Sequence, residues 1–141
     1  MQLPKIIKGN SHTDSRGTLK FNNFFDTSEI KRMYIVQNSS TEILRGWQGH
    51  KVEQRWFSVI YGSFEIYLIA VENWEQPSRD LKSIKYDLNA STMDILHVPS
   101  GYVSCLKSKE LNSKLLAMSD YGLLEISDEY RFEIDYFKMI N

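Results

Sequence analysis

The sequence has little of several features that mark particular classes of protein. Its 141 residues include one cysteine, Cys105, so no internal disulfide can form, and no cysteine or histidine lies at zinc-binding spacing from it. It has only three prolines and no repeat, linker or low-complexity tract. No apolar run approaches the roughly 20 residues of a membrane-spanning helix, and residues 1–10 lack the apolar core of a signal peptide. We therefore expect a single domain over residues 1–141, cytoplasmic and without a membrane partner.

The sequence also lacks an excess of charge of either sign. The 17 basic and 18 acidic residues give a formal net charge of -1, which provides no general attraction to nucleic acid. The hydrophobic content of 42% and the charged content of 25% are typical of a soluble globular protein. A local basic pocket remains compatible with this balance, so we expect a small-molecule ligand and no nucleic acid.

Short segments of alternating apolar and polar residues dominate what is present, and this period of two is typical of β-strands. Turn-forming residues separate them, and no amphipathic helix of a dozen residues occurs. Many short strands at roughly ten-residue spacing favour an all-β sandwich or barrel. The tail, residues 128–137, fits either a last strand or a short helix. The predicted strands are 19–25, 32–37, 56–61, 64–71, 81–88, 93–98, 102–106 and 114–119, of which 64–71 is apolar on both faces.

The stretch from Arg45 to Ser63, R-G-W-Q-G-H-K-V-E-Q-R-W-F-S-V-I-Y-G-S, concentrates polar chemistry on what we predict to be a β-hairpin. A basic and amide-rich run ends at Gln54, and an aromatic and β-branched strand follows. The period of two slips within the run, and we place the irregularity near Gly49. Composition alone is equally compatible with an ordinary exposed hairpin edge.

A second polar cluster, His97-Val98-Pro99-Ser100-Gly101-Tyr102-Val103-Ser104, runs from one strand through a Pro-x-Gly turn into the next. With the first stretch, it resembles the two halves of the signature of cupins, a family of small β-barrels. The order of Asp14-Ser15-Arg16-Gly17, Arg45-Gly46, Gly62, Pro99-x-Gly101 and the segment from Asp120 to Glu129 resembles the deoxysugar-nucleotide isomerases. These are the dTDP-4-dehydrorhamnose 3,5-epimerases and the WxcM-like dTDP-4-keto-6-deoxyglucose 3,4-ketoisomerases. The resemblance implies a cupin-type jelly-roll β-barrel, also called a double-stranded β-helix.

The departures from the cupin pattern concern metal ligands. Metal-binding cupins carry His-x-His, a following Glu and a third His, whereas this chain has Gln48-Gly49-His50, then Glu53 or Gln54, and Ser104. One histidine with an uncertain carboxylate is a poor transition-metal site, because such ions usually take three or four nitrogen or oxygen ligands. We predict no metal and no cofactor, which is compatible with the isomerases that the chain resembles.

The departures also concern the catalytic base. The resembled isomerases place a histidine directly after Arg-Gly-x, where this chain has Gln48, and an amide cannot take up a proton at neutral pH. His50, two residues on and on the same strand face, is the best remaining base. Arg45 and Lys51 are its expected partners for the diphosphate or the enolate oxygen.

The remaining assignments for the site follow from the resemblance. We expect Tyr121 to donate a proton to the opposite face of the sugar, although Tyr102 and Tyr61 are alternatives that the sequence cannot separate. The predicted substrate-binding residues, in addition to Arg45 and Lys51, are Gln48, Gln54, Arg16 and Ser104.

The resemblance thus predicts an enzyme that isomerises or epimerises a nucleotide-linked, dTDP-type 4-keto-6-deoxyhexose in deoxysugar or surface-polysaccharide biosynthesis. The chain length favours 3,4-ketoisomerisation, whereas residues 99–129 favour 3,5-epimerisation. Two other classes stay open. One is a non-catalytic sugar-nucleotide or carbohydrate-binding cupin, and the other is a structural partner in a polysaccharide-assembly complex. We expect a homodimer, because the resembled families pair through their sheets and an open barrel leaves strand edges to cover.

Overall fold

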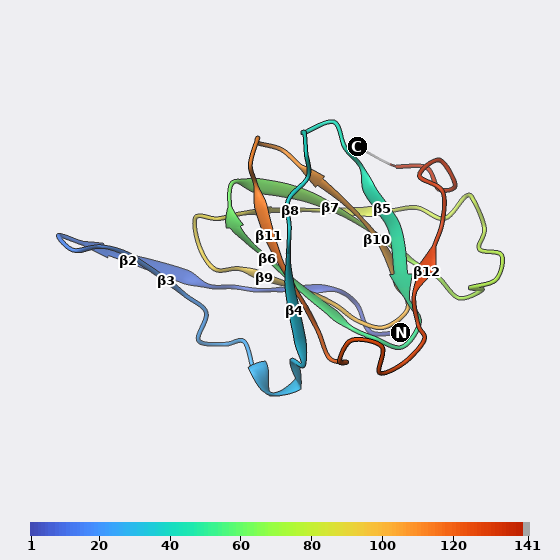
Figure 1. Cartoon of the computed structure of the whole chain (residues 1–141), viewed down its shortest axis with the longest axis horizontal. Helices are drawn as coiled ribbons and strands as arrows, with labels where there is room; N and C mark the ends of the chain where they lie inside the picture. Colours follow the sequence, from blue (N-terminus) through green and yellow to red (C-terminus); the bar gives the residue numbers. More distant parts are fainter. Residues whose placement is uncertain (140–141) are drawn as a thin grey trace.

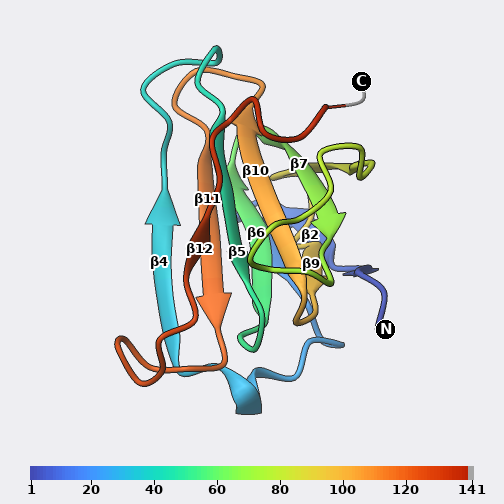
Figure 2. The same ribbon diagram turned by 90° about the vertical axis from the view of Figure 1, so that its right-hand side faces the viewer.

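The computed structural model describes residues 1–139, and they form two five-stranded antiparallel sheets that face each other, with a two-stranded hairpin beside them (Figures 1 and 2). One short 3-10 helix, η1 (Thr27–Glu29), is the only helix in these residues. This is the predicted all-β, cupin-type jelly roll. The first sheet has the order β1 (Lys5–Ile7), β9 (Ile95–Val98), β6 (Arg55–Tyr61), β11 (Lys114–Ser119) and β4 (Arg32–Val36); the second has the order β12 (Tyr130–Arg131), β5 (Arg45–His50), β10 (Tyr102–Ser108), β7 (Ser63–Ala70) and β8 (Ile84–Asn89).

The main hydrophobic core fills the space between the two sheets. Strand β7 supplies Phe64, Ile66 and Leu68 to this core, and each is at most 1% exposed. Its alternate residues, including Tyr67 and Ile69, pack on the outer face beneath the C-terminal tail. The prediction that this strand is covered on both faces is therefore confirmed. Burial of each large apolar side chain stabilises the fold by about 1.5–3 kcal/mol.

The predicted hairpin between residues 45 and 63 is wrong in its pairing. Strands β5 and β6 lie in opposite sheets, because the loop at residues 51–54 crosses from one sheet to the other. The predicted irregularity exists but lies earlier than Gly49. Arg45 pairs with Leu106 and Gln48 pairs with Ser104, so β5 has one more residue than β10 across this interval.

Several predicted strands are shorter in the structure. The segment 19–25 ends as a strand at Phe21, because Asn22 accepts hydrogen bonds from the backbone N–H groups of Phe24 and Phe25 and turns the chain. The segment 81–88 begins as a strand only at Ile84. The tail forms a two-residue strand, β12, and not a short helix.

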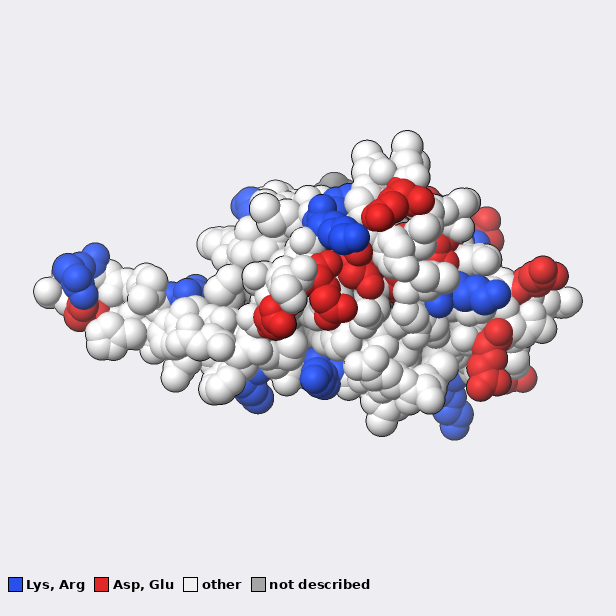
Figure 3. Space-filling model, turned by 90° about the horizontal axis from the view of Figure 1, so that it is seen from below, with Lys and Arg blue, Asp and Glu red and all other residues white. Residues whose placement is uncertain are grey.

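A hairpin of β2 (Asn10–Asp14) and β3 (Gly17–Phe21) projects from the body of the molecule as an extended arm (Figure 1). At its tip Arg16 binds the carboxylate of Asp14, with 2.7 Å between Nη2 and Oδ2. Gly17 closes the turn at φ +130°, a conformation that favours glycine. Acidic and basic side chains are interspersed over the face shown in Figure 3. None of the helices in residues 1–139 is long and apolar enough to cross a membrane.

Candidate active site

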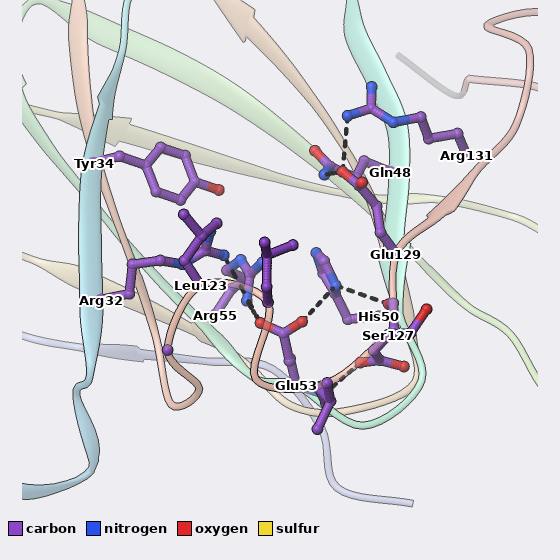
Figure 4. Close-up of a pocket in the computed structure, with 14 residues that line it drawn as sticks. Arg32, Tyr34, Gln48, His50, Glu53, Arg55, Leu123, Ser127, Glu129 and Arg131 are labelled. Carbon is purple, nitrogen blue, oxygen red and sulfur yellow. Dashed lines mark hydrogen bonds and ion pairs between the residues drawn. The ribbon is translucent and has the colours of Figure 1, made fainter.

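A cavity of about 590 Å³ opens at one end of the barrel, between strands β4, β5 and β6 and the segment that follows β11 (Figure 4). Its wall is mostly polar and carries three arginines, a histidine and three carboxylates. The lining residues are Arg32, Tyr34, Gln48, His50, Glu53, Arg55, Gly122, Leu123, Leu124, Ile126, Ser127, Asp128, Glu129 and Arg131.

His50, the last residue of β5, is buried and contacts the cavity. Its Nδ1 lies 3.1 Å from the backbone carbonyl oxygen of Asp128. A carbonyl can only accept a hydrogen bond, so Nδ1 carries the proton and Nε2 carries the free lone pair. Burial, and then the charge of Arg55, lower the pKa of His50 below its ordinary value of 6.5, against the opposing effects of Glu53 and Asp128. The ring is therefore neutral at pH 7.

Glu53 stands beside His50 in a buried network of charges. Its Oε1 accepts hydrogen bonds from Arg55 Nη1 at 2.9 Å and from Ser119 Oγ at 2.8 Å. Its Oε2 lies 3.6 Å from His50 Nδ1. Burial would raise the pKa of Glu53, but the bonds from Arg55 and Ser119 outweigh it and lower the pKa. Glu53 is thus a carboxylate that holds Arg55 in place at the cavity.

Asp128 fixes the loop that joins the two sheets. Its carboxylate accepts hydrogen bonds from the backbone N–H groups of Lys51, Val52 and Glu53, at 3.0, 2.9 and 2.7 Å. The same residue presents its carbonyl oxygen to His50. One residue after β11 therefore positions both the histidine and the loop that carries Glu53.

The residues of the cavity do not fit a metal ion. Within residues 1–139, His50, Glu53 and Asp128 are the group whose possible ligand atoms lie within 4.8 Å of one another. However, the Asp128 oxygens already accept three backbone N–H groups, and Glu53 is already bound by Arg55. The guanidinium of Arg55 would also repel a cation, so these three side chains make a hydrogen-bonded support and not a ligand set.

Gln48 forms a second polar contact at the rim of the cavity, on the same face of β5 as His50. Its Nε2 donates to Glu129 Oε1, and Arg131 Nη2 donates to the same oxygen at 2.7 Å. Strand β12 brings these two residues to β5, since Arg131 pairs with Gln48 and Tyr130 with Gly49. The amide at the position of the missing histidine therefore binds a carboxylate from the tail.

The structure brings together four of the eight residues that the sequence predicts for the site. Gln48 and His50 line the cavity. Ser104 and Arg45 line smaller adjoining spaces, and Gln48 and His50 line these spaces as well. Ser104 Oγ donates to the carbonyl of Gln48 at 3.4 Å. Arg45 donates to Asn38 Oδ1 at 3.0 Å and pairs with no carboxylate of residues 1–139.

The other four predicted residues lie apart from the cavity. Lys51 is exposed in the loop after β5, and Arg16 lies at the tip of the arm with its side chain 87% exposed. Gln54 binds Asp120 and His97 on the other side of the first sheet. Tyr121 follows β11 but is not among the lining residues, and neither is the alternative Tyr61, which is exposed. The remaining alternative, Tyr102, does adjoin the cavity, because it lines the same small space as His50 and Ser104, but its hydroxyl donates to the carbonyl of Gln2.

Sequence reasoning missed several residues of the cavity wall. Arg32 and Tyr34 face the cavity from β4, and Arg55 faces it from β6. The alternation of β6 contains a signal for Arg55, because Phe57 and Val59 share its parity and lie in the core. The signal in β4 is weaker, because Val36 shares the parity of Arg32 and Tyr34 and lies in the core, but the apolar residues Met33 and Ile35 face outward and are 69% and 57% exposed.

No protein-family model and no curated protein sequence matches this chain. Solved structures do. A 3,4-ketoisomerase from Helicobacter canadensis is 26% identical, over 86% of this chain and 87% of that chain, with a TM-score of 0.62. The chain has the fold of the sugar 3,4-ketoisomerases and 3,5-epimerases. The resemblance predicted from the sequence is thereby confirmed.

Two further structures show the range of this likeness. A variant of a 3,4-ketoisomerase from Thermoanaerobacterium thermosaccharolyticum, in complex with TDP-4-keto-6-deoxyglucose, is 21% identical over 94% of this chain and 90% of that chain, with a TM-score of 0.67. The dTDP-4-dehydrorhamnose 3,5-epimerase of Bacillus anthracis, with TDP and pyrophosphate bound, is 14% identical over 89% of this chain and 77% of that chain, with a TM-score of 0.68. Both identities are low, so these two likenesses concern the fold.

Proposed function

We propose that the protein is a sugar-nucleotide isomerase that moves the keto group of a TDP-linked 4-keto-6-deoxyhexose from C4 to C3. The observation that carries this proposal is the neutral His50, whose Nδ1 is bound to the Asp128 carbonyl and whose Nε2 is free at a cavity lined by arginines. A neutral imidazole is a suitable base for a proton next to a ketone, and arginines stabilise the oxyanion that forms when it leaves.

The reaction begins with proton transfer to His50 Nε2. The base removes the hydrogen from C3, and the electron pair of that bond moves to give an enolate with its charge on O4. Arg55 and Arg32 line the same cavity and balance this charge. The proton returns to C4 from the imidazolium, and the hydroxyl hydrogen moves from O3 to O4. Both hydrogens are conserved, so no oxidant or reductant is needed.

The substrate would contact residues that line the cavity or adjoin it. Tyr34 contacts the cavity from β4, and its hydroxyl can bind or protonate a sugar oxygen. Arg45, Gln48 and Ser104 adjoin His50 and supply a guanidinium, an amide and a hydroxyl for the sugar and the diphosphate. Lys51, Gln54 and Arg16 lie outside this cavity, so we assign them no contact with a substrate bound there.

The share of each similar structure's chain that is matched favours ketoisomerisation over 3,5-epimerisation. The matched region spans 87% and 90% of the two ketoisomerase chains but 77% of the epimerase chain. Ketoisomerisation needs proton exchange at C3 and C4, whereas 3,5-epimerisation needs it at C3 and C5. The positions of deuterium entry therefore separate the two reactions.

The test is proton NMR of TDP-4-keto-6-deoxyglucose with the purified protein in deuterated water, preceded by a thermal-shift assay of binding. We expect thermal stabilisation, loss of the C3 proton signal and appearance of a 3-keto product. Stabilisation without exchange at any carbon would identify a non-catalytic binding protein and overturn the proposal. Exchange at C3 and C5 without a 3-keto product would replace ketoisomerisation by epimerisation.

We further propose that residues 1–141 act as a single domain in a cytoplasmic homodimer in polysaccharide biosynthesis. The outer face of β4 supports a dimer, since Met33 and Ile35 are largely exposed there and β4 is the edge strand of its sheet. Analytical ultracentrifugation of the wild type and of a Met33→Lys, Ile35→Lys variant tests this, and a monomeric wild type would contradict it.

A further inference from the structure

The contact between Gln48 and Glu129 places an exposed carboxylate in the cavity, in addition to the buried carboxylates of Glu53 and Asp128. Glu129 precedes β12, and its Oε1 accepts hydrogen bonds from Gln48 Nε2 and Arg131 Nη2. No hydrogen bond from residues 1–139 reaches Oε2, so this oxygen is open to a ligand. Glu129 lines the same cavity as His50, and its side chain lies beside Gln48 in Figure 4.

His50 and Glu129 lie in different surroundings. His50 is buried and is held by a backbone carbonyl, whereas Glu129 is half exposed and is held by an amide and a guanidinium. Glu129 directly precedes β12, whose residues Tyr130 and Arg131 pair with Gly49 and Gln48 of β5, so the chain brings Glu129 to the end of β5 that carries His50. The cavity thus offers, in addition to the imidazole of His50, a carboxylate that is partly exposed and has one oxygen without a hydrogen bond in residues 1–139.

Ketoisomerisation requires two separate proton movements. One hydrogen moves from C3 to C4, and another moves from O3 to O4. A single base that holds the carbon-bound hydrogen as an imidazolium cannot also accept the hydroxyl hydrogen. We propose that Glu129 is a catalytic residue that carries the hydroxyl hydrogen from O3 to O4 while His50 carries the carbon-bound hydrogen. This inference rests on the proposed function.

The step is balanced in atoms and charge. After His50 has removed the C3 hydrogen, the enolate carries its charge on O4 and keeps the hydrogen on O3. The Glu129 carboxylate accepts the O3 hydrogen and donates it to O4, which moves the negative charge to O3. The imidazolium of His50 then protonates C4, and the C3 ketone forms. Both side chains return to their starting states.

Gln48 acquires a role from this assignment. Its amide and the guanidinium of Arg131 both donate to Oε1 of Glu129, which leaves Oε2 without a hydrogen bond in residues 1–139. A histidine at position 48 could compete for the same proton, but an amide positions Glu129 without titrating. The glutamine that stands in place of the expected base is therefore a positioning residue for Glu129.

The test compares Glu129→Gln with the matched control Asp135→Asn, an exposed carboxylate in the same tail. Both are followed by NMR in deuterated water with TDP-4-keto-6-deoxyglucose. We expect Glu129→Gln to keep deuterium entry at C3 within about threefold of the wild type, since His50 still forms and quenches the enolate. Formation of the 3-keto product should fall by about 10²- to 10⁴-fold, the usual range for loss of an acid–base group. Asp135→Asn should keep both rates.

Each other outcome has a definite meaning. If Glu129→Gln forms the 3-keto product at the wild-type rate, Glu129 carries no proton and the inference fails. If it loses deuterium entry and product formation equally, with an unchanged melting temperature, Glu129 has no separate oxygen step and the inference again fails. If the wild type itself shows no exchange with the sugar, it is the proposed function that fails.

Discussion

The protein has two buried strand histidines, and their surroundings differ in the one property that decides whether a histidine can act as a base. His50 binds the Asp128 carbonyl through Nδ1 and keeps Nε2 free at a cavity. His97 lies on the outer face of the first sheet, where its ring stacks on Trp56 at 4.8 Å and its Nε2 binds Gln54 Oε1 at 2.6 Å. Burial is the leading cause of a lowered pKa at both residues.

The difference teaches that burial and a lowered pKa do not by themselves identify a base. Both rings are neutral at pH 7, but the Nε2 of His97 is engaged by Gln54, which Asp120 in turn holds. The Nε2 of His50 instead has no hydrogen-bond partner among the described residues 1–139, and Arg55 and Arg32 line the same cavity. A free nitrogen next to cationic groups distinguishes the candidate active site from a structural histidine.

The largest expected effect comes from removing the two histidines in turn. His50→Gln should lower the rate of 3-keto product formation by at least about 10³-fold, because the base is lost. His97→Gln should leave the rate within about threefold, because His97 does not line the cavity. Product formation measured by NMR for both variants checks this. An active His50→Gln variant would remove the distinction between the two sites.

A second prediction concerns the ion pair of Arg55 and Glu53 beside His50. Arg55→Met leaves Glu53 buried without its closest cationic partner, with side-chain exposures of 6% and 10% in the wild-type pair. We expect a loss of roughly 2–4 kcal/mol in the free energy of unfolding, at the lower end because the cavity is open to water. Urea denaturation measures it. The double variant Arg55→Met, Glu53→Gln should recover part of the loss, and no recovery would contradict the pairing.

A third prediction compares the aspartates that support the two histidines. Asp128→Asn weakens three charge-assisted hydrogen bonds to the loop after β5, and Asp120→Asn weakens two bonds to Gln54. We expect losses of about 1–3 kcal/mol for the first and about 1 kcal/mol for the second. Only Asp128→Asn should also lower the catalytic rate, because the Asp128 carboxylate holds the loop that follows His50 and carries Glu53. Equal catalytic effects of the two changes would contradict this account.

The smallest expected effect is a shift in the pH dependence of the rate. Protonated His50 cannot accept a proton, so kcat/KM falls as the pH drops through the His50 pKa, which lies below 6.5. Arg55 is the second cause of this lowering, after burial. Its removal therefore raises the pKa and moves the acid limb to higher pH. Profiles from pH 4.5 to 8 for the wild type and Arg55→Met check the direction, and a shift to lower pH would contradict it.

The sequence predicts correctly those strands whose apolar side chains are buried and whose polar side chains face solvent. The apolar faces of β7 and the alternation of β11 give strands close to those observed. Strand β4 does not follow this rule. Its inward face carries Arg32 and Tyr34 and its outward face carries Met33 and Ile35, because the barrel interior is a polar cavity at this end. Hydrophobic periodicity does not separate the faces of such a strand, since Val36 on the inward face is also apolar and lies in the core.

The candidate site was predictable only where its residues lie on one strand. His50 and Gln48 follow from the period of two within β5. Asp128 and Glu129 reach them only because the tail returns to pair with β5, and a two-residue strand leaves little trace in the sequence. The hairpin prediction failed for a related reason, since the loop after His50 crosses between the sheets and nothing local in its residues specifies the crossing.

The most direct test of the central claim is the protonation state of His50 itself. The chain has three histidines, so ¹⁵N-histidine labelling gives three ring systems, and the His50→Gln variant assigns the one of interest. Long-range ¹H–¹⁵N spectra at pH 7 should show His50 as a neutral ring with the proton on Nδ1 and a bare Nε2. A proton on Nε2, or an imidazolium at this pH, would contradict the assignment of His50 as the base.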